Sequence, residues 1–358
     1  MAALKSFLRR LTPNQSSSDL NATGFNKALD GTLFPKTSPS IDGDDCLHDC
    51  ASCTIKYPNK WSIDESGKLY GEVKGWSRHL IVATGKSDWV RDVTDEKGSI
   101  MEAVADSQIK PNNGRLMLSA SNIPVPEKPE VEGASRVLLL PSFTWVENVT
   151  PSNVPELISH IINSAPTNTT PLDHKDSSAS LLSPPQSPLR SEPQLKIQDC
   201  PHNYLILLCS QKTRDARCGQ SAPLLRREFE RHLRPLGLYR DLHDERPGGV
   251  GIFFISHVGG HKFAANVMIY RRAGVAGIQS SSKEENEAAE RNDTHDENVP
   301  NQKHVEEPRE AAQCIWLARV RPEDCENIVR YTVLQGKVVK PERQLRGGFD
   351  RSRQLISW

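Results

Sequence analysis

The chain has 358 residues, enough for two domains of ordinary size that each bury a core. Lys plus Arg and Asp plus Glu both number 45, so the formal net charge is zero and the basic excess that marks nucleic-acid-binding proteins is missing. No apolar run reaches the length of about eighteen residues that a membrane-spanning helix needs. Composition therefore argues against a nucleic-acid partner and against a membrane span.

The eight cysteines are too few and too unevenly spread for a disulfide scaffold in a chain of this length. We therefore expect a reducing compartment, in which thiols serve as metal ligands, redox groups or small buried side chains.

Residues 1–40 are predicted to be disordered or to act as a targeting segment. Residues 4–11 are basic and amphipathic, no acidic residue precedes Asp19, and three serines follow at positions 16–18. This composition suits a mitochondrial presequence, which predicts a mitochondrial location. A disordered basic tail on a cytoplasmic protein is the alternative.

Three cysteines come next, in the pattern Cys46-x3-Cys50-x2-Cys53. Thiols at this spacing can bind zinc or form a redox pair. No partner pair of ligands follows at zinc-finger spacing, so a loop with incidental thiols is the favoured interpretation.

Apolar runs at residues 79–84, 115–119 and 136–140 predict strands, and Lys86, Asp88 and Trp89 after the first run are interpreted as fold-capping residues. A helix is predicted from Pro151, with Ser152 or Asn153 as its cap. Residues 166–198 are rich in Ser, Pro and Thr and predict a linker. Residues 41–165 therefore form the predicted N-terminal domain.

The second predicted domain covers residues 199–345, with a tail at 346–358. An apolar run at 204–208 leads to Cys209, a helix is predicted at 221–236, and a strand at 251–256 leads to His257-Val258-Gly259-Gly260-His261. Another strand is predicted at 263–270. Residues 273–311 are polar and predict a disordered insertion. A strand from Cys314 and a helix from Pro322 follow.

An internal repeat links the two halves. Residues 144–151 (TWVENVTP) resemble residues 315–322 (IWLARVRP), and a helix is predicted after each copy. Residues 79–84 likewise match 204–209, and residues 116–119 match 253–256. This pattern predicts two related α/β halves, of which the first lacks Cys and His at the site positions.

The candidate site consists of Cys209, Cys218, His257 and His261. Thiolate and imidazole are ligands for both iron–sulfur clusters and zinc. An eight-residue connector can bring both sulfurs to one metal, and its basic residues would lower the thiol pKa values; Gly219 would then allow a left-handed turn into the helix. Gly259 and Gly260 would let the backbone fold closely around a cofactor.

An iron–sulfur cluster is our hypothesis for this site; zinc, or buried thiols and hydrogen-bonded imidazoles without metal, remain alternatives. Imidazole ligands raise the reduction potential of a cluster and allow its reduction to be coupled to proton uptake.

The chain resembles the fungal sucrase/ferredoxin-like family in Cys209-x8-Cys218-Gly219, in residues 83–89 (ATGKSDW) and 257–266 (HVGGHKFAAN), and in the segments 316–336 and 345–348. The resemblance runs from about Asp45 to the C-terminus, apart from the polar insertions. It implies a C-terminal thioredoxin-like ferredoxin domain with a [2Fe–2S] cluster, in which Cys209 and Cys218 bind one iron and His257 and His261 the outer iron.

Combined with the repeat, the resemblance predicts an α/β fold of two tandem thioredoxin-like domains, the first without a cofactor. The family is associated with mitochondrial redox or thiol quality control. No residue identifies the redox partner.

The last three residues, Ile356-Ser357-Trp358, resemble the C-terminal signal by which the cytosolic iron–sulfur assembly machinery recognises its clients. A tryptophan that docks into the core is the competing interpretation. Loading in the cytosol would conflict with a mitochondrial presequence.

Two other function classes remain open. The first is a metal-free thiol oxidoreductase that uses Cys46, Cys50 and Cys53 or the Cys209–Cys218 pair, although no Cys-x-x-Cys opens a helix after a strand. The second is a zinc-stabilised interaction module. No hydrolase triad, phosphate loop or dinucleotide fingerprint occurs, so electron transfer is favoured over conversion of a substrate.

Overall fold

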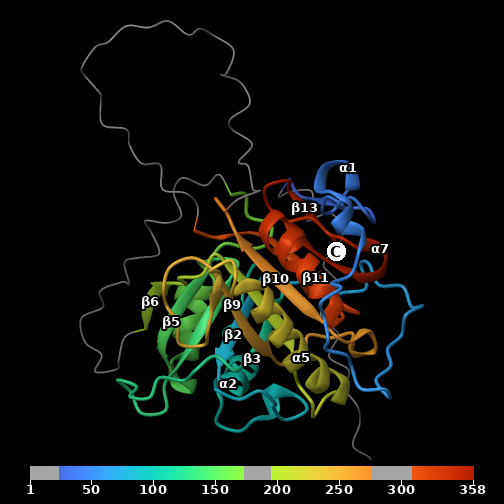
Figure 1. Cartoon of the computed structure of the whole chain (residues 1–358). Coiled ribbons are helices and arrows are strands. Elements are labelled where there is room, and N and C mark those ends of the chain that lie inside the picture. Colours follow the sequence, from blue (N-terminus) through green and yellow to red (C-terminus); the bar gives the residue numbers. More distant parts are fainter. Residues whose placement is uncertain (1–23, 173–194, 276–308) are drawn as a thin grey trace, which may run out of the picture.

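A computed structural model describes residues 24–172, 195–275 and 309–358 (Figure 1). It is a mixed α/β fold with one 13-stranded sheet in the order β1-β13-β12-β11-β10-β7-β9-β3-β2-β4-β5-β6, with β8 paired to β9. The strands are β1 (Asn26–Lys27), β2 (Arg78–Ala83), β3 (Leu116–Ser121), β4 (Ser135–Leu140), β5 (Thr144–Val149), β6 (Lys196–Asp199), β7 (Tyr204–Cys209), β8 (Tyr239–Arg240), β9 (Val250–Ile255), β10 (Val267–Arg272), β11 (Ala311–Leu317), β12 (Leu345–Asp350) and β13 (Leu355–Ile356).

The helical elements lie between and after these strands. They are α1 (Pro39–Asp42), η2 (Asp44–Leu47), η3 (Val93–Asp95), α2 (Ile100–Asp106), η4 (Pro151–Asn153), α3 (Val154–Glu156), η5 (Leu157–Ile162), α5 (Ala216–Leu233), η6 (His261–Phe263), η7 (Pro322–Asp324), α6 (Cys325–Asn327), η8 (Ile328–Val333) and α7 (Pro341–Gln344). Among the described residues, none of these helices is long and apolar enough to cross a membrane.

The same strand pairings occur in both halves of the chain. β2 is parallel to β3 and antiparallel to β4, which is antiparallel to β5. β7 is parallel to β9 and antiparallel to β10, which is antiparallel to β11. The central strands β2, β7 and β9 are buried along their whole length, which explains why their sequences are continuous apolar runs rather than alternating patterns.

The two segments that the sequence pairs at 144–151 and 315–322 form the same structures. Each copy has a non-glycine residue in the left-handed region near the end of its strand: Asn148 (φ 62°) lies within β5, and Arg319 (φ 55°) lies two residues after β11. A proline-initiated turn comes next, and in each copy a side-chain oxygen three residues along accepts a backbone N–H: Asn153 from Thr150 at 2.9 Å, and Asp324 from Arg321 at 2.7 Å. The helical turns η5 and η8 complete the two copies.

The register proposed from sequence for the first strands is one residue out. Thr84 donates its N–H to Ser121 O and Ser210 donates its N–H to Ile255 O, so Ala83 at the end of β2 corresponds to Cys209 at the end of β7. Both strands are apolar on both faces, so no alternation of polar and apolar residues fixes the register in the sequence.

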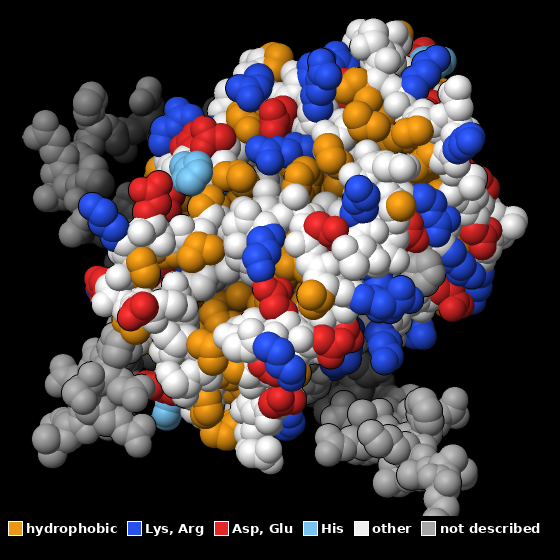
Figure 2. Space-filling model, turned by 90° about the horizontal axis from the view of Figure 1, so that it is seen from below, with side chains coloured by type: hydrophobic (Ala, Val, Ile, Leu, Met, Phe, Trp, Pro, Cys, Tyr) orange, Lys and Arg blue, Asp and Glu red, His pale blue; other side chains and the backbone are white. Residues whose placement is uncertain are grey.

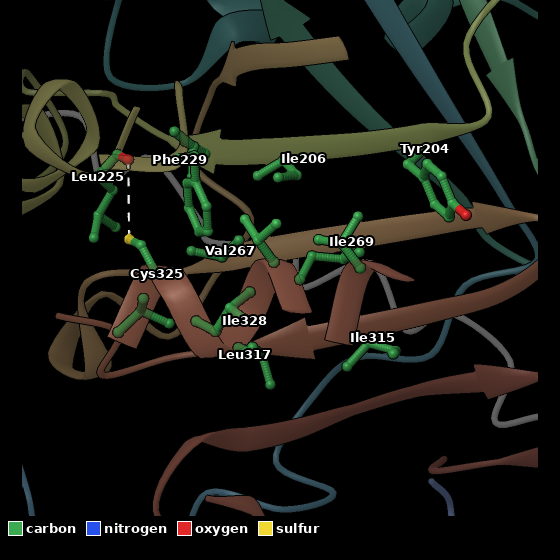
Figure 3. Close-up of a cluster of buried hydrophobic side chains, with 14 of the residues drawn as sticks. Tyr204, Ile206, Leu225, Phe229, Val267, Ile269, Ile315, Leu317, Cys325 and Ile328 are labelled. Carbon is green, nitrogen blue, oxygen red and sulfur yellow. Dashed lines mark hydrogen bonds between the residues drawn. The ribbon is translucent and has the colours of Figure 1, made fainter. Parts of the chain in front are cut away.

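The halves are joined in one sheet rather than forming two separate sheets. β3 and β9 pair through Ser121 and Ile255, and the side-chain amide oxygen of Asn122 accepts the Phe254 N–H at 2.7 Å. The helices cover the outer surfaces: α2, α3 and η5 share a core with the strands of the first half, and α5, α6 and η8 with those of the second (Figure 3).

A third core contains residues from the strands of both halves and none from these helices, so the inner faces of the two halves pack together. His79 Nδ1 of β2 lies 3.1 Å from the Tyr270 hydroxyl of β10, and its Nε2 lies 2.9 Å from Ser119 Oγ. Burial lowers the pKa of His79 to about 3, so this histidine is neutral at the contact between the halves.

Several predicted segments fall largely outside the described residues: residues 1–23 of the predicted disordered or targeting segment (1–40), residues 173–194 of the linker (166–198) and residues 276–308 of the polar insertion (273–311). The described residues that flank them are packed. Phe25, Leu33 and Phe34 are buried, and β6, inside the predicted linker, pairs with β5. On the face in Figure 2, cationic and anionic side chains are interspersed, in keeping with the zero net charge.

Candidate metal centre

Cys209 and Cys218 meet at the first turn of α5. Cys209 ends β7, and the connector curls back so that Cys218 packs against it together with Ala264; the two cysteines are free thiols and buried. Helix α5 begins where the Asp215 carboxylate accepts the N–H of Arg217 at 2.9 Å, a standard N-cap contact. The eight-residue connector therefore brings Cys209 and Cys218 into contact, and binding of one metal by both sulfurs stays a prediction.

The role predicted for Gly219 is wrong. Gly219 is part of α5 and does not make a left-handed turn. A Cβ at this position would lie 2.5 Å from Lys212 Cβ and 3.0 Å from Lys212 Cα. The glycine is needed because the connector crosses directly over the first turn of the helix.

His257 lies beside the cysteine pair, two residues after the end of β9. Its Nδ1 is 3.9 Å from Cys209 Sγ, and the residue is only half-buried. Its backbone N–H donates to Gln211 Oε1 at 2.8 Å, and the Gln211 amide in turn donates to Val90 O at 2.6 Å. His261 begins the turn η6, and its side chain lies outside the described part of the structure.

The two thiols are electrostatically different. A hydrogen bond from Cys218 lowers the pKa of Cys209 to about 5, against the effect of burial, and His257 contributes in the same direction. The pKa of Cys218 is raised, first because its thiol donates to Cys209 and then by burial. The pair therefore favours a Cys209 thiolate with Cys218 as its hydrogen-bond donor, so negative charge collects at the end of β7.

Arg346 of β12 supplies positive charge beside this thiolate. Its Nη1 donates to Gly259 O at 3.0 Å and to Asn266 Oδ1 at 2.8 Å, and its Nη2 donates to Glu72 O at 3.1 Å. Burial lowers the pKa of Arg346 to about 10, and the Cys209 charge opposes this shift. The buried Nε atom has no hydrogen-bond partner among the described residues.

The sequence gives Arg346 only as part of a family motif, with no role assigned. A possible signal was an arginine followed by two glycines in a segment that resembles the family. Arg346 packs against the loop of residues 257–261. Gly260 in this loop has φ 65°, and a Cβ at this position would collide with the Arg346 guanidinium. Gly260 therefore lets the backbone of this loop pack closely against Arg346.

A segment from the first half covers the sulfurs. Trp61 and Ile63 pack against the Cys209–Cys218 cluster, and Trp61 Nε1 donates to Arg217 O at 3.3 Å. The Arg319 Nε donates to Asp64 O at 2.7 Å and holds the far end of this segment. Trp61 and Ile63 also line a cavity of about 640 Å³, so they stand between that cavity and the sulfurs.

The connector is also bound by the segment that the sequence marks as fold-capping. Thr213 donates its N–H to Asp88 Oδ1 at 3.0 Å and its hydroxyl to Asp88 Oδ2 at 2.8 Å, while Ser210 Oγ donates to Ser87 O at 2.8 Å. Although burial opposes it, these Thr213 hydrogen bonds lower the pKa of Asp88. A structural role for Asp88 is confirmed, and its target is the Cys209–Cys218 connector.

A second group of possible metal ligands lies elsewhere. One ligand atom each of Cys50, His232 and Glu326 lies within 4.8 Å of the others, so this group could hold a metal. Cys50 belongs to the Cys46-x3-Cys50-x2-Cys53 pattern, whereas no sequence motif marks His232 or Glu326. No ligand spacing could find them, because the fold brings them in from α5 and α6.

The C-terminal tail is docked. Ile356 pairs in β13 with β12 and β1, and Ser357 Oγ accepts the Gly348 N–H at 2.9 Å. The half-buried Trp358 ring lies 4.4 Å from the ring of Trp76. This geometry matches the interpretation of Trp358 as a docking residue.

Comparison with known proteins identifies a family and relatives that each match part of the chain. The sucrase/ferredoxin-like family matches residues 69–347. Actin patches distal protein 1 of Saccharomyces cerevisiae is 28% identical over 271 residues, which cover 72% of this chain and 81% of that protein.

Altered inheritance of mitochondria protein 32 of Clavispora lusitaniae is 29% identical over 196 residues, which cover 53% of this chain and 50% of that protein. No solved structure matches significantly. The sequence resemblance pointed, within the family, to the altered inheritance of mitochondria protein, and the match to Actin patches distal protein 1 covers more of the chain. With the family match spanning most of its residues, the chain belongs to the sucrase/ferredoxin-like family.

Proposed function

We propose that this protein is an electron-transfer protein that holds a [2Fe–2S] cluster through Cys209, Cys218, His257 and His261. One observation carries the proposal: two thiols from β7 and α5 and an imidazole from the loop after β9 meet at one place. Thiolate and imidazole are the donor types that [2Fe–2S] centres use. Membership of a family described as ferredoxin-like supports the same conclusion.

The surroundings fit such a group. A cluster bound by thiolates carries negative charge, and Arg346 offers a buried cation whose Nε has no partner among the described residues. Gly259 and Gly260 both have positive φ, a backbone conformation that other residues rarely adopt, so the turn beside His257 depends on the two glycines. When bound, the cluster would accept and release one electron.

The residues of the chain divide the remaining tasks. Trp61 and Ile63 exclude water from the buried cysteine side. The half-buried His257 leaves the imidazole side nearer to solvent, so an electron partner would approach there. Arg346 fixes the histidine loop through Gly259 O and offsets thiolate charge, which raises the reduction potential.

We also interpret the two halves as thioredoxin-like units, residues 41–165 and 199–345. In both, a first strand lies between a parallel partner and an antiparallel one, with a helix in the parallel crossover. That order is the thioredoxin order, and the second unit, which carries the cysteines, would be the ferredoxin.

A role in redox or thiol quality control, in mitochondria or in the cytoplasm, follows from the family resemblance. The name of one relative, altered inheritance of mitochondria protein 32, refers to mitochondria. Recognition of Ile356-Ser357-Trp358 by the cytosolic iron–sulfur assembly machinery is a further proposal. It would require release of Trp358 from its contact with Trp76.

Anaerobic purification tests the proposal. We expect a red-brown protein with iron and acid-labile sulfide in equal amounts. His257→Cys should keep the cluster and lower its reduction potential, because thiolate replaces imidazole. His243→Cys, in an exposed turn, is the matched control and should leave the spectrum unchanged. A colourless protein that holds zinc at Cys209 and Cys218 would contradict the proposal.

A further inference from the structure

The group of Cys50, His232 and Glu326 is separate from the cysteine pair at the start of α5. His232 lies in the last turn of α5, fourteen residues after Cys218, or about 21 Å along the helix axis. Cys50 is buried, and His232 and Glu326 are half-buried. A sulfur, an imidazole nitrogen and a carboxylate oxygen are thus within 4.8 Å of one another at a second place in the molecule.

Packing of α6 against α5 brings two of these ligands together. Cys325 is buried in the core shared with α5, and its Sγ lies 4.0 Å from Leu225 O (Figure 3). The next residue, Glu326, therefore lies beside the end of α5 that carries His232.

The N-terminal segment adds the third ligand. Cys50 donates its N–H to Glu323 O at 3.0 Å, and the Asn327 amide donates to His48 O at 2.8 Å. Lys340 pairs with Asp49 on the same segment and with Asp324. These contacts fix residues 48–50 against the turn that begins α6, so the position of Cys50 Sγ is set by backbone and side-chain contacts on several sides.

The guanidinium of Arg231 lies close to the sulfur of Cys50 and the ring nitrogen of His232. Arg231 Nη2 is 3.3 Å from Cys50 Sγ, 3.0 Å from His232 Nε2 and 2.7 Å from Glu228 Oε2. An amino group of a guanidinium has two hydrogens, so it cannot satisfy three acceptors. His232 Nε2 faces a donor and therefore presents its lone pair, the form that a metal requires.

We propose that Cys50 Sγ, His232 Nε2 and a carboxylate oxygen of Glu326 bind a structural Zn²⁺. Sulfur, nitrogen and oxygen ligands are the donors that zinc prefers. Binding releases the Cys50 thiol proton to solvent, after which one thiolate and one carboxylate balance the charge of the ion. When the ion binds, the Arg231 guanidinium would move away from His232. Arg231 would still be paired with the almost fully buried carboxylate of Glu228, so its charge would stay balanced.

The geometry requires a modest contraction. Zinc bonds of about 2.0–2.3 Å put tetrahedral ligand atoms about 3.3–3.8 Å apart, so the group has to close by about 1 Å. The N–H of Cys53 donates to Cys50 O at 3.2 Å in a tight turn, and the Cys53 thiol lies 3.6 Å from Ile55 O, outside the group. Cys53 would have to turn its thiol toward the ion to supply the fourth ligand of a closed structural site. The ion would clamp the segment that continues to Trp61 and Ile63, the cover of the other site.

Metal analysis of the full chain, purified without chelators, tests this proposal. We expect about one zinc per chain, retained in Cys209→Ser and lost in Cys50→Ser and in His232→Gln. Cys46→Ser is the matched control, since Cys46 is a buried thiol of the same segment that is not in the group. Iron and sulfide measured in the same samples report on the cluster. The zinc proposal and the cluster proposal can therefore be refuted independently of each other.

Co²⁺ added to the metal-stripped protein gives a second measurement. A thiolate-to-cobalt absorption band should appear in the Cys209→Ser protein and be absent when Cys50→Ser is added. If a variant does not fold, chelation of the unmodified protein decides: its thermal midpoint should fall on chelation and recover with Zn²⁺. Zinc content that is unchanged in Cys50→Ser, or lost only in Cys209→Ser, would overturn the proposal.

Discussion

The two halves of the molecule have the same strand pairings and different chemistry at the same strand ends. Where the second half has Cys209 at the end of β7, the first half has Ala83 at the end of β2. Two residues beyond the parallel partner strand, His257 of the second half corresponds to Ile123 of the first. The two backbones are similar at these positions, so the side chains there would decide which half carries the proposed site.

The first half has become a support for the second. Its Ser87, Asp88 and Val90 bind the connector that carries the two cysteines through Ser210, Thr213 and Gln211. Residues 61–64, which precede β2, cover the sulfurs. The first half, which has no Cys or His at the corresponding strand ends, thus lies beside the proposed ligands of the second half.

The largest effect is expected when the second half is given the residue of the first. Cys209→Ala copies Ala83 and removes the thiolate, so iron and sulfide content should fall more than ~10-fold because a cluster rarely tolerates the loss of a ligand. Cys200→Ala removes another buried thiol and should keep the cluster. Retention of iron in Cys209→Ala would mean that Cys209 is not a cluster ligand and that the difference between Cys209 and Ala83 does not explain the function.

Acid should weaken the contact between the halves. The pKa of His79 is lowered to about 3 from an ordinary 6.5, with burial as the main cause and Arg115 second, so the unfolded chain binds a proton that the folded chain refuses. Stability should therefore fall by about 1.4 kcal/mol per pH unit between pH 6 and pH 3 on account of this residue.

Urea unfolding at pH 7, 6 and 5 measures this slope. His79→Gln retains a hydrogen-bonding side chain without a charge and should flatten the curve. An identical slope in the variant would mean that other groups, such as His202 with its pKa lowered to about 4, account for the acid sensitivity.

A smaller effect is expected from Asp88→Asn, which weakens the brace between the halves. Loss of charge-assisted hydrogen bonds to Thr213 at a half-exposed site should cost about 1 kcal/mol of unfolding free energy. Cluster loss in air should be faster, because the connector carries both cysteines. Asp92→Asn is the control, because the Asp92 carboxylate accepts hydrogen bonds from Thr94 of its own turn, and it should leave the rate of cluster loss unchanged.

The smallest effect is expected at the tail. Trp358→Ala removes a ring contact with Trp76 and should cost about 1 kcal/mol or less, without loss of iron from protein reconstituted in vitro. Reduced iron in cells together with normal reconstitution in vitro would favour recognition of the tail by an assembly partner. Loss in both would show that docking of Trp358 supports the site itself.

Sequence patterns predict local structure and contacts along one short connector well in this chain. The apolar runs of β2, β7 and β9 are visible because buried strands are continuously hydrophobic, and the meeting of Cys209 with Cys218 follows from the short connector between them. Gly219 was misinterpreted because its neighbour Lys212 is apparent only when the connector crosses α5.

Contacts between distant segments could not be predicted. Arg346 reaches Gly259 from another strand, and His232 and Glu326 meet Cys50 only because α5 and α6 pack together. The pairing of Ser121 with Ile255, which makes one sheet of two halves, involves so few residues that no pattern announces it.

That short junction has a mechanical consequence. Ile255 lies opposite Ser121 across the junction and opposite Cys209 across β7, and His257 follows two residues later. A motion that separates the two halves at the Ser121–Ile255 pairing would displace the start of the loop that carries His257. A cofactor that holds this loop in place would in turn stabilise the pairing. The Ser256 N–H donates to Ala120 O at 2.8 Å across this junction. Its rate of hydrogen exchange should therefore be lower when a cofactor is bound.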